Sequence, residues 1–321
     1  MKAKKIIYIG LIVMLALGLF VPLVTEIPWL TNLVTPPIAL LLGLLFALIF
    51  GKVYPKINKM MSKYLLQYSV VGLGFGMNFH SSLASGKDGM LFTIISVAGT
   101  MLLGWLLGRH LFKLDKNTSY LISSGTAICG GSAIAAVGPV IKAKEGEMSV
   151  ALGTVFILNA VALFLFPYIG RLLAMSQADF GFWAAIAIHD TSSVVGAGQA
   201  YGSDALEIAT TVKLTRALWI APLALITSLI FKSSDQKVSI PRFILFFILA
   251  MLINTYLLGD YPQVGQGISR IARKFLTLSL FFIGAGLSRD VLKSVGLKSF
   301  LLGVSLWFII SISTLLYIIL F

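Results

Sequence analysis

The stretch that decides the fold reads Ser123-Ser124-Gly125-Thr126-Ala127-Ile128-Cys129-Gly130-Gly131-Ser132-Ala133-Ile134. It lies inside an apolar run, yet glycine and hydroxyl residues make up much of it. Each glycine costs a helix about 1 kcal/mol relative to alanine, so Gly130-Gly131 predicts an interruption. A helix that restarts there would point free N–H groups and its positive dipole end at the break, which suits an anion. Close packing of helices through small residues is the alternative explanation.

The composition around this stretch is typical of a membrane protein. Of 321 residues, 58% are apolar and 12% are charged, about half the charged share of a soluble domain. A membrane-spanning helix needs about 20 apolar residues. Eleven runs qualify, at residues 6–24, 33–51, 64–84, 89–109, 118–141, 148–174, 180–200, 205–231, 240–259, 272–288 and 297–320.

We therefore expect an all-α polytopic membrane protein with about 11 transmembrane segments and little chain left for a soluble domain. The domain prediction is one transmembrane transporter domain, residues 1–321. It comprises an extra N-terminal helix in residues 1–30, a first half in 31–174 and a second half in 175–321. The first apolar run is expected to be a retained helix, because no small-residue cleavage site follows it.

The net charge of +13 is largely an orientation signal. Basic residues follow the second, fourth and eighth runs on the side of the basic N-terminus, which predicts a cytoplasmic N-terminus. A loop holding Arg270, Arg273 and Lys274 would lie on the other side and disagrees. The residues that agree are Lys52, Lys56, Lys59, Lys63, Arg109, Lys113, Lys116, Lys232, Lys237 and Arg242.

Two internal matches indicate repeats. A shift of 210 residues aligns the third and tenth runs, and Tyr54-Pro55 and Tyr261-Pro262 precede them. Runs 2 to 4 then pair with runs 9 to 11, an odd number of spans apart, so the copies are inverted, as in many secondary transporters. The matched residues are Ser69, Gly74, Gly76 and Gly86 with Ser279, Gly284, Gly286 and Gly296.

A second match, at a shift of 60 residues, pairs runs 5 and 6 with runs 7 and 8. Two arrangements stay open: broken helices that cross the membrane, or re-entrant hairpins that enter from opposite sides. Lys142 and Lys144 slightly favour hairpins, whereas the 24-residue length of run 5 favours a crossing helix. The matched residues are Ala127, Ile128, Ser132, Gly138 and Glu147 with Ala187, Ile188, Ser192, Gly198 and Glu207.

Charged residues inside the apolar runs are the other candidates. Asp190 followed by Thr191 resembles a helix N-cap and predicts a second break facing the first. With His189 it forms a coupling or gating pair that could carry a proton, because histidine titrates near neutral pH. Lys213 and Arg216 each cost about 2.5–3.5 kcal/mol at the centre of a span, so they must face protein or water.

Arginine suits bidentate contact with oxyanions, which favours an anion site. An ion pair of these cations with Asp190, Glu147 or Glu207 is the alternative. The expected substrate-binding residues are Cys129, Gly130, Gly131, Ser132, Thr191, Ser192, Ser193, Lys213 and Arg216. Secondary candidates are Asn78, Asn159, Glu147 and Glu207.

The runs Ala127–Ala136, Ile188–Thr191 and Val212–Arg216, in this order, are similar to those of the YeiH/TauZ-like family of proposed sulfate exporters in the bacterial inner membrane. The similarity covers almost all of the chain from the second run onward. It implies a multi-pass plasma-membrane carrier, distantly similar to cation/proton antiporters and bile-acid symporters, that moves sulfate or a related anion. Ser192-Ser193-Val194 stands where the family has Ala-Gln-Val, which leaves the ligands at 192 and 193 open.

These features predict an ion-coupled secondary active transporter of a small anion. An anion channel is one alternative, and an intramembrane enzyme using Cys129, His189 and Asp190 is the other. The expected partners are the lipid bilayer, a small anion, protons or sodium as coupling ion, and a second copy of the chain. No cofactor, metal or nucleic acid is expected, because Cys129 is the only cysteine and no phosphate-binding glycine motif is present.

Overall fold

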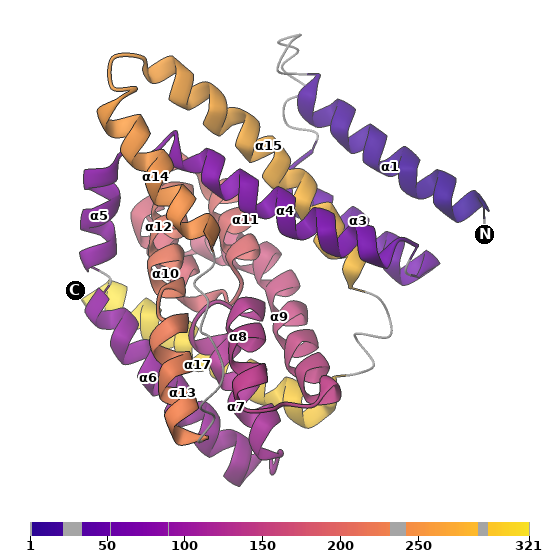
Figure 1. Ribbon diagram of the computed structural model, residues 1–321, viewed down its shortest axis with the longest axis vertical. Coiled ribbons are helices and arrows are strands. Elements are labelled where there is room, and N and C mark those ends of the chain that lie inside the picture. Colours follow the sequence, from indigo (N-terminus) through magenta and orange to yellow (C-terminus); the bar gives the residue numbers. More distant parts are fainter. Residues whose placement is uncertain are drawn as a thin grey trace. The chain divides into compact units, whose positions relative to one another are not determined.

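A computed structural model describes residues 2–21, 34–51, 53–88, 90–231, 242–287 and 295–320 (Figure 1). Within these ranges every regular element is a helix, which confirms the all-α prediction. The chain divides into two compact units, Met1–Phe79 with Arg242–Arg289 and His80–Pro241 with Asp290–Phe321. Five helices in the described ranges are long and apolar enough to cross a membrane: Ala3–Phe20, Phe92–Leu111, Glu145–Leu172, Ser203–Ile230 and Leu297–Leu320.

The first unit is built around two antiparallel helices, α4 and α15, which lie side by side (Figure 1). Gly72 of α4 lies against Ala272 of α15, and Gly76 lies against Ser269. The helices of this unit are α1 (Lys2–Phe20), α3 (Pro36–Phe50), α4 (Pro55–Gly74), α14 (Arg242–Tyr256) and α15 (Pro262–Gly286).

The segments matched at a shift of 210 begin with similar local structures in this unit. Tyr54 and Tyr261 precede α4 and α15 with nearly the same backbone angles, φ −134° and ψ 68° against φ −127° and ψ 57°. A proline then starts each helix, where its fixed φ is favourable. A Cβ on Gly74 would lie 2.7 Å from the Phe247 carbonyl oxygen of α14, and a Cβ on Gly284 would clash with the Leu40 carbonyl oxygen of α3.

Two predicted boundaries were wrong. The run expected at 64–84 is not one helix: α4 begins earlier, at Pro55, and ends at Gly74, and residues 75–78 are not helical. The run expected at 272–288 is the second part of α15, which begins at Pro262. Arg270, Arg273 and Lys274 therefore lie inside α15, not in a loop. A helix with a polar face tolerates such charges, so a search for unbroken apolar runs starts it too late. Of the residues used for orientation, Lys52, Lys232 and Lys237 lie outside the described residues.

The second unit contains the two interrupted stretches. Its element α6 (Met90–Leu106) continues as a π-helical turn, η1 (Leu107–Leu111), and packs against α7. The remaining elements are α5 (Phe79–Asp88), α7 (Lys116–Ala127), α8 (Gly131–Val140), α9 (Glu145–Leu172), α10 (Gln177–Ala187), α11 (Thr191–Tyr201), α12 (Ser203–Ala217), α13 (Ile220–Ile230) and α17 (Leu297–Leu320).

Helices α7 and α8 form a hairpin. Their lengths are about 18 Å and 15 Å at 1.5 Å per residue, so a continuous path would separate their outer ends by about 33 Å. The link from α8 to α9, residues 141–144, spans at most about 14 Å. Asn117 at the start of α7 nevertheless donates from Nδ2 to Glu147 Oε2 of α9 over 3.0 Å. The chain must therefore turn back at residues 128–130.

Helices α10 and α11 form a second hairpin. Gln177 at the start of α10 accepts hydrogen bonds from the backbone N–H groups of Asp204 and Ala205, at 3.0 Å and 3.4 Å, directly after α11 ends. The chain turns back at residues 188–190. Both α7 and α10 end at the alanines that the 60-residue shift matches, Ala127 and Ala187.

The two hairpins open at opposite ends of α9, which is about 42 Å long at 1.5 Å per residue. The first opens beside Glu147, in the first turn of α9. The second opens beside Arg171, in its last turn, which donates from Nη2 to the Ala200 carbonyl oxygen over 2.6 Å. The hairpin tips therefore point toward each other along α9.

Helices α12 and α13 run in the direction opposite to α9. α12 starts at the open end of the second hairpin and lies beside α10 and α11. α13 ends near the start of α7, where the Thr227 and Tyr120 hydroxyl oxygens are 2.7 Å apart. Each hairpin is thus followed by a long helical path that returns past the other hairpin.

Candidate functional site

The two hairpin tips, residues 128–130 and 188–190, meet beside the middle of α9; we call this place the tip site. Gly130 has φ +66° and ψ −122°, a conformation that glycine adopts far more easily than other residues. A Cβ at Gly130 would lie 3.3 Å from the His189 carbonyl oxygen and 3.4 Å from Asp190 Cα. It would also lie 3.1 Å from Val155 Cγ1 on α9. Close approach of the tips therefore depends on the missing side chain.

Asn159, on α9, holds the second tip. Its Oδ1 accepts hydrogen bonds from the backbone N–H groups of His189 (3.1 Å) and Asp190 (3.2 Å). These donors have no helical partner, because they lie between α10 and α11. The Asn159 side chain is only 3% exposed, and its Nδ2 has no hydrogen-bond partner in the described structure. One buried donor of Asn159 thus remains available.

The helix N-termini at the two tips are capped differently. At α11, the Asp190 carboxylate accepts a hydrogen bond from Ser192 N at 3.1 Å and another from the Ser192 hydroxyl. At α8, the equivalent residue is Gly130, which has no side chain to cap the helix. The neighbouring Cys129 sulfur interacts with the Ala133 N–H and the Ser132 hydroxyl. One N-terminus therefore faces a carboxylate of the protein, while the other faces a thiol.

Lys213 and Arg216 bind the C-terminal ends of the first helices of both hairpins. Lys213 Nζ donates to the carbonyl oxygens of Ile188 (2.7 Å) and Ala185 (3.2 Å). Arg216 donates from Nε to Ala127 O (2.8 Å), from Nη2 to the same oxygen, and from Nη1 to Ile186 O (3.2 Å). A helix leaves its last four carbonyls without helical partners and carries partial negative charge there, so buried cations suit this position.

The tip site has a formal surplus of one positive charge. Lys213 and Arg216 are fully buried, and with Asp190 their formal charges sum to +1 (two cations minus one carboxylate). The partial charges of two helix N-termini and two helix C-termini cancel to first order. A buried net charge is costly unless it is compensated. A small anion would supply the compensation.

Three further polar side chains are fully or almost fully buried without a hydrogen-bond partner in the described structure: His189 in the second tip, Thr126 just before the first tip, and Thr211 in α12, two residues before Lys213. Neither imidazole nitrogen of His189 has one, and its side chain is 0% exposed. The hydroxyls of Thr126 and Thr211 are also without one. The sequence contains no signal for these two threonines, since threonine is common where membrane helices pack.

Comparison with known proteins places the chain in a family. A family model described as conserved hypothetical protein 698 matches residues 9–303. The chain belongs to this family. A UPF0324 membrane protein of Bacteroides thetaiotaomicron is 65% identical over 98% of this chain and 96% of its own length. A relative from Porphyromonas gingivalis is 61% identical over 99% of this chain and 97% of its own length. A relative from Photobacterium profundum is 48% identical over 91% of this chain and 89% of its own length. No solved structure matches.

The family therefore consists of membrane proteins, in agreement with the five apolar helices. The match to this family model also agrees with the resemblance to the YeiH-like family. The relatives' names give no activity or substrate. Transport, the substrate and the absence of enzymatic activity remain predictions.

The predicted site residues fall into three groups. The first group lies together at the hairpin tips and consists of Cys129, Gly130, Gly131, His189, Asp190, Thr191, Lys213 and Arg216. Ser192 and Ser193 are buried in the first turn of α11, and Ser132 is exposed at the start of α8. Glu147 lies at the open end of the first hairpin, Glu207 in α12 before Lys213, and Asn78 in the other unit.

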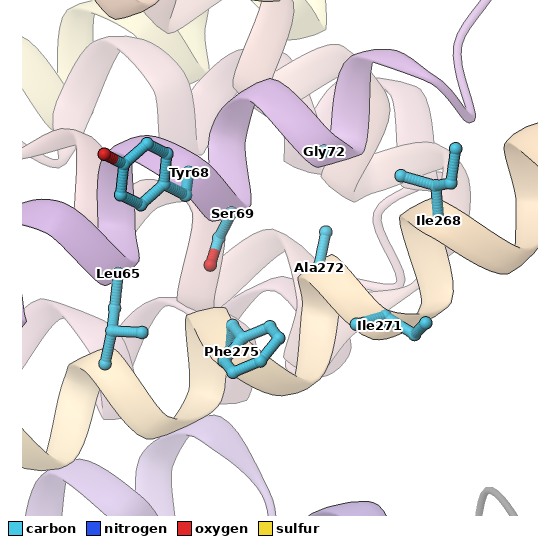
Figure 2. A pocket seen from close by; sticks show the side chains of 8 residues that line it. All are labelled: Leu65, Tyr68, Ser69, Gly72, Ile268, Ile271, Ala272 and Phe275. Atoms are coloured by element: carbon cyan, nitrogen blue, oxygen red, sulfur yellow. The ribbon is translucent and has the colours of Figure 1, made fainter.

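A groove with a volume of about 250 Å³ lies between α4 and α15 in the first unit (Figure 2). Apolar side chains such as Leu65 and Phe275 line it. Ser69, one of the residues matched at a shift of 210, contributes a buried hydroxyl without a hydrogen-bond partner in the described structure. A groove with so few polar groups offers no ligands for a charged substrate, so we place the candidate site at the tips.

Proposed function

We propose that this protein is an ion-coupled secondary transporter of a small anion, sulfate or a related oxyanion, which binds at the tip site. The observation that carries the proposal is the complete burial of two basic side chains, Lys213 and Arg216, at two meeting hairpin tips, next to the unpartnered Nδ2 of Asn159. Buried ionisable residues in membrane segments commonly mark the path of a substrate or ion.

The membrane arrangement we propose is a multi-pass protein of the bacterial inner membrane with a cytoplasmic N-terminus and about 11 segments. Two of these segments are re-entrant hairpins that enter from opposite sides. α9, about 42 Å long, exceeds the roughly 30 Å hydrocarbon core, so tips at its middle would lie near the midplane. The equivalent caps at Tyr54 and Tyr261 and the oppositely directed hairpins support inverted repeats.

The anion is proposed to bind at the N-terminus of α8. At α11 the Asp190 carboxylate already accepts from the first-turn N–H groups, so a second anion there would be repelled. At α8, Gly130 places no side chain at this position and the nearby Cys129 thiol is only a weak acceptor, so the positive helix end favours an oxyanion. Asn159 Nδ2, His189 and the Ser132 hydroxyl would add hydrogen bonds. Lys213 and Arg216 retain one and two N–H groups that their hydrogen bonds to carbonyls do not use.

The transport proposal is tested with purified protein in proteoliposomes. We expect saturable uptake of radiolabelled sulfate or sulfite that depends on a pH gradient, with His189 and Asp190 as the proposed coupling pair. An uncoupled conductance that does not saturate would indicate an anion channel. No flux of any small anion would refute both.

Changing Asn159 to aspartate tests the anion position. The carboxylate can still accept from the N–H groups of His189 and Asp190, but it has no donor and adds negative charge. A lost hydrogen bond to a charged ligand costs about 1.5–3 kcal/mol, so we expect the Kd for the anion to rise at least about tenfold. The measurement is the anion-induced shift in thermal unfolding. Ser311→Ala serves as the control. It removes a hydroxyl on α17 that also has no hydrogen-bond partner in the described structure, and it should leave the anion-induced shift unchanged. An unaltered Kd for Asn159→Asp would place the anion elsewhere.

A further inference from the structure

The carbonyl groups that accept from Lys213 and Arg216 form a cluster at the tip site. Ala127 O comes from the first hairpin, and Ala185 O, Ile186 O and Ile188 O come from the second. All four are at or next to the C-terminal ends of interrupted helices. In transporters with interrupted helices, carbonyls of this kind coordinate the coupling sodium ion or proton.

Both cations come from one helix at a spacing that fits the cluster. Lys213 and Arg216 are three residues apart, which places them on neighbouring parts of one helix face. α12 starts beside the open end of the second hairpin and runs along it, so its third turn reaches the tip. Lys213 donates to carbonyls of the second hairpin, whereas Arg216 donates to carbonyls of both hairpins.

We propose that this carbonyl cluster is a cation site whose permanent occupants are the Lys213 ammonium and the Arg216 guanidinium, so the protein binds no sodium ion there. The tethered cations take the place of an exchangeable one and hold both tips together. This inference rests on the proposed function in one respect: if the protein transports an anion, the transport should be independent of sodium. The cation site itself is testable without transport.

Two substitutions of Lys213 should differ in whether they leave space for another cation. Lys213→Ala removes the ammonium and leaves space beside Ile188 O and Ala185 O for a small cation. Lys213→Met also removes the charge, but its side chain fills the space. Two buried carbonyls lose their donor in either variant. We expect the midpoint of thermal unfolding to fall by about 5 °C or more in choline chloride for both.

The experiment follows unfolding of the purified full-length protein by tryptophan fluorescence. Methylammonium chloride or sodium chloride replaces choline chloride at constant ionic strength. We expect methylammonium to raise the midpoint of Lys213→Ala, saturably and by most of the loss, and to leave Lys213→Met low. Lys298→Ala, which removes an exposed lysine at the start of α17, should match the wild type in all salts.

Equal responses of Lys213→Ala and Lys213→Met, or midpoints that do not fall, would overturn the inference. If Lys213→Ala cannot be purified, the wild type still decides, since its anion-induced thermal shift must be the same in sodium and choline salts. A sodium requirement would overturn the inference while supporting transport. An absence of any anion-induced shift or flux would overturn the proposed function and leave the methylammonium result standing.

Discussion

Arg216→Ala is expected to lower the free energy of unfolding by about 3–5 kcal/mol, which corresponds to a fall in the unfolding midpoint of roughly 10 °C. The Arg216 side chain is completely buried and donates to Ala127 O and Ile186 O, one on each hairpin. Its removal leaves both carbonyls unsatisfied and separates the tips. The measurement is thermal unfolding of the purified protein, with and without sulfate. We expect the sulfate-induced shift to disappear.

A matched control exists at the outer end of the second hairpin. Arg171 also donates to a carbonyl oxygen, that of Ala200 at 2.6 Å, but the contact is exposed to solvent. Exposed contacts of charged side chains contribute about 0–1 kcal/mol, so Arg171→Ala should shift the midpoint by only a few degrees. The unfolding midpoint of Arg216→Lys should lie between those of Arg216→Ala and the wild type, because an ammonium keeps the charge but lacks the planar guanidinium group that reaches both tips. Equal losses for Arg171→Ala and Arg216→Ala would contradict the proposed role.

Much of the tip site could be predicted from local sequence. Consecutive glycines in an apolar run predict a break, and Asp190 before Thr191 predicts an N-cap; the structure has a helix boundary at each. The 60-residue shift matches the ends of α7 and α10 to the residue. These features are local, because glycine conformation and helix capping involve only near neighbours along the chain.

Other features depend on contacts distant in sequence and could not be predicted. Hairpin and crossing helix have the same local pattern, and only pairs such as Asn117 with Glu147 distinguish them. Likewise, Lys213 and Arg216 were expected to contact an anion or a carboxylate. Their hydrogen bonds in the structure are to backbone carbonyls, which every sequence contains and no residue type marks. The contact of an anion with their remaining N–H groups stays a prediction.

Gly130→Ala is expected to destabilise the protein by about 2–4 kcal/mol and to weaken anion binding at least about tenfold. At φ +66° and ψ −122° a Cβ imposes backbone strain of about 1–3 kcal/mol. The methyl group would also press on the His189 carbonyl oxygen and on Asp190 Cα, at 3.3 Å and 3.4 Å, so the second tip must move. The anion site at the N-terminus of α8 would then lose its alignment with Asn159.

The adjacent glycine provides the control. Gly131 is the first residue of α8 and can offer the proposed anion only its backbone N–H, which alanine keeps. The atoms nearest to a Cβ there are side-chain atoms of Phe156 and Leu152, at 3.3–3.4 Å. Alanine favours a helix by about 1 kcal/mol over glycine, so Gly131→Ala should be neutral or slightly stabilising. Unfolding midpoints and anion-induced shifts of both variants are measured side by side. If Gly130→Ala behaves like Gly131→Ala, the tips tolerate a side chain and their close approach does not build the site. A loss confined to Gly130→Ala would tie anion binding to the contact between the hairpins, because the two variants differ by one position and add the same methyl group.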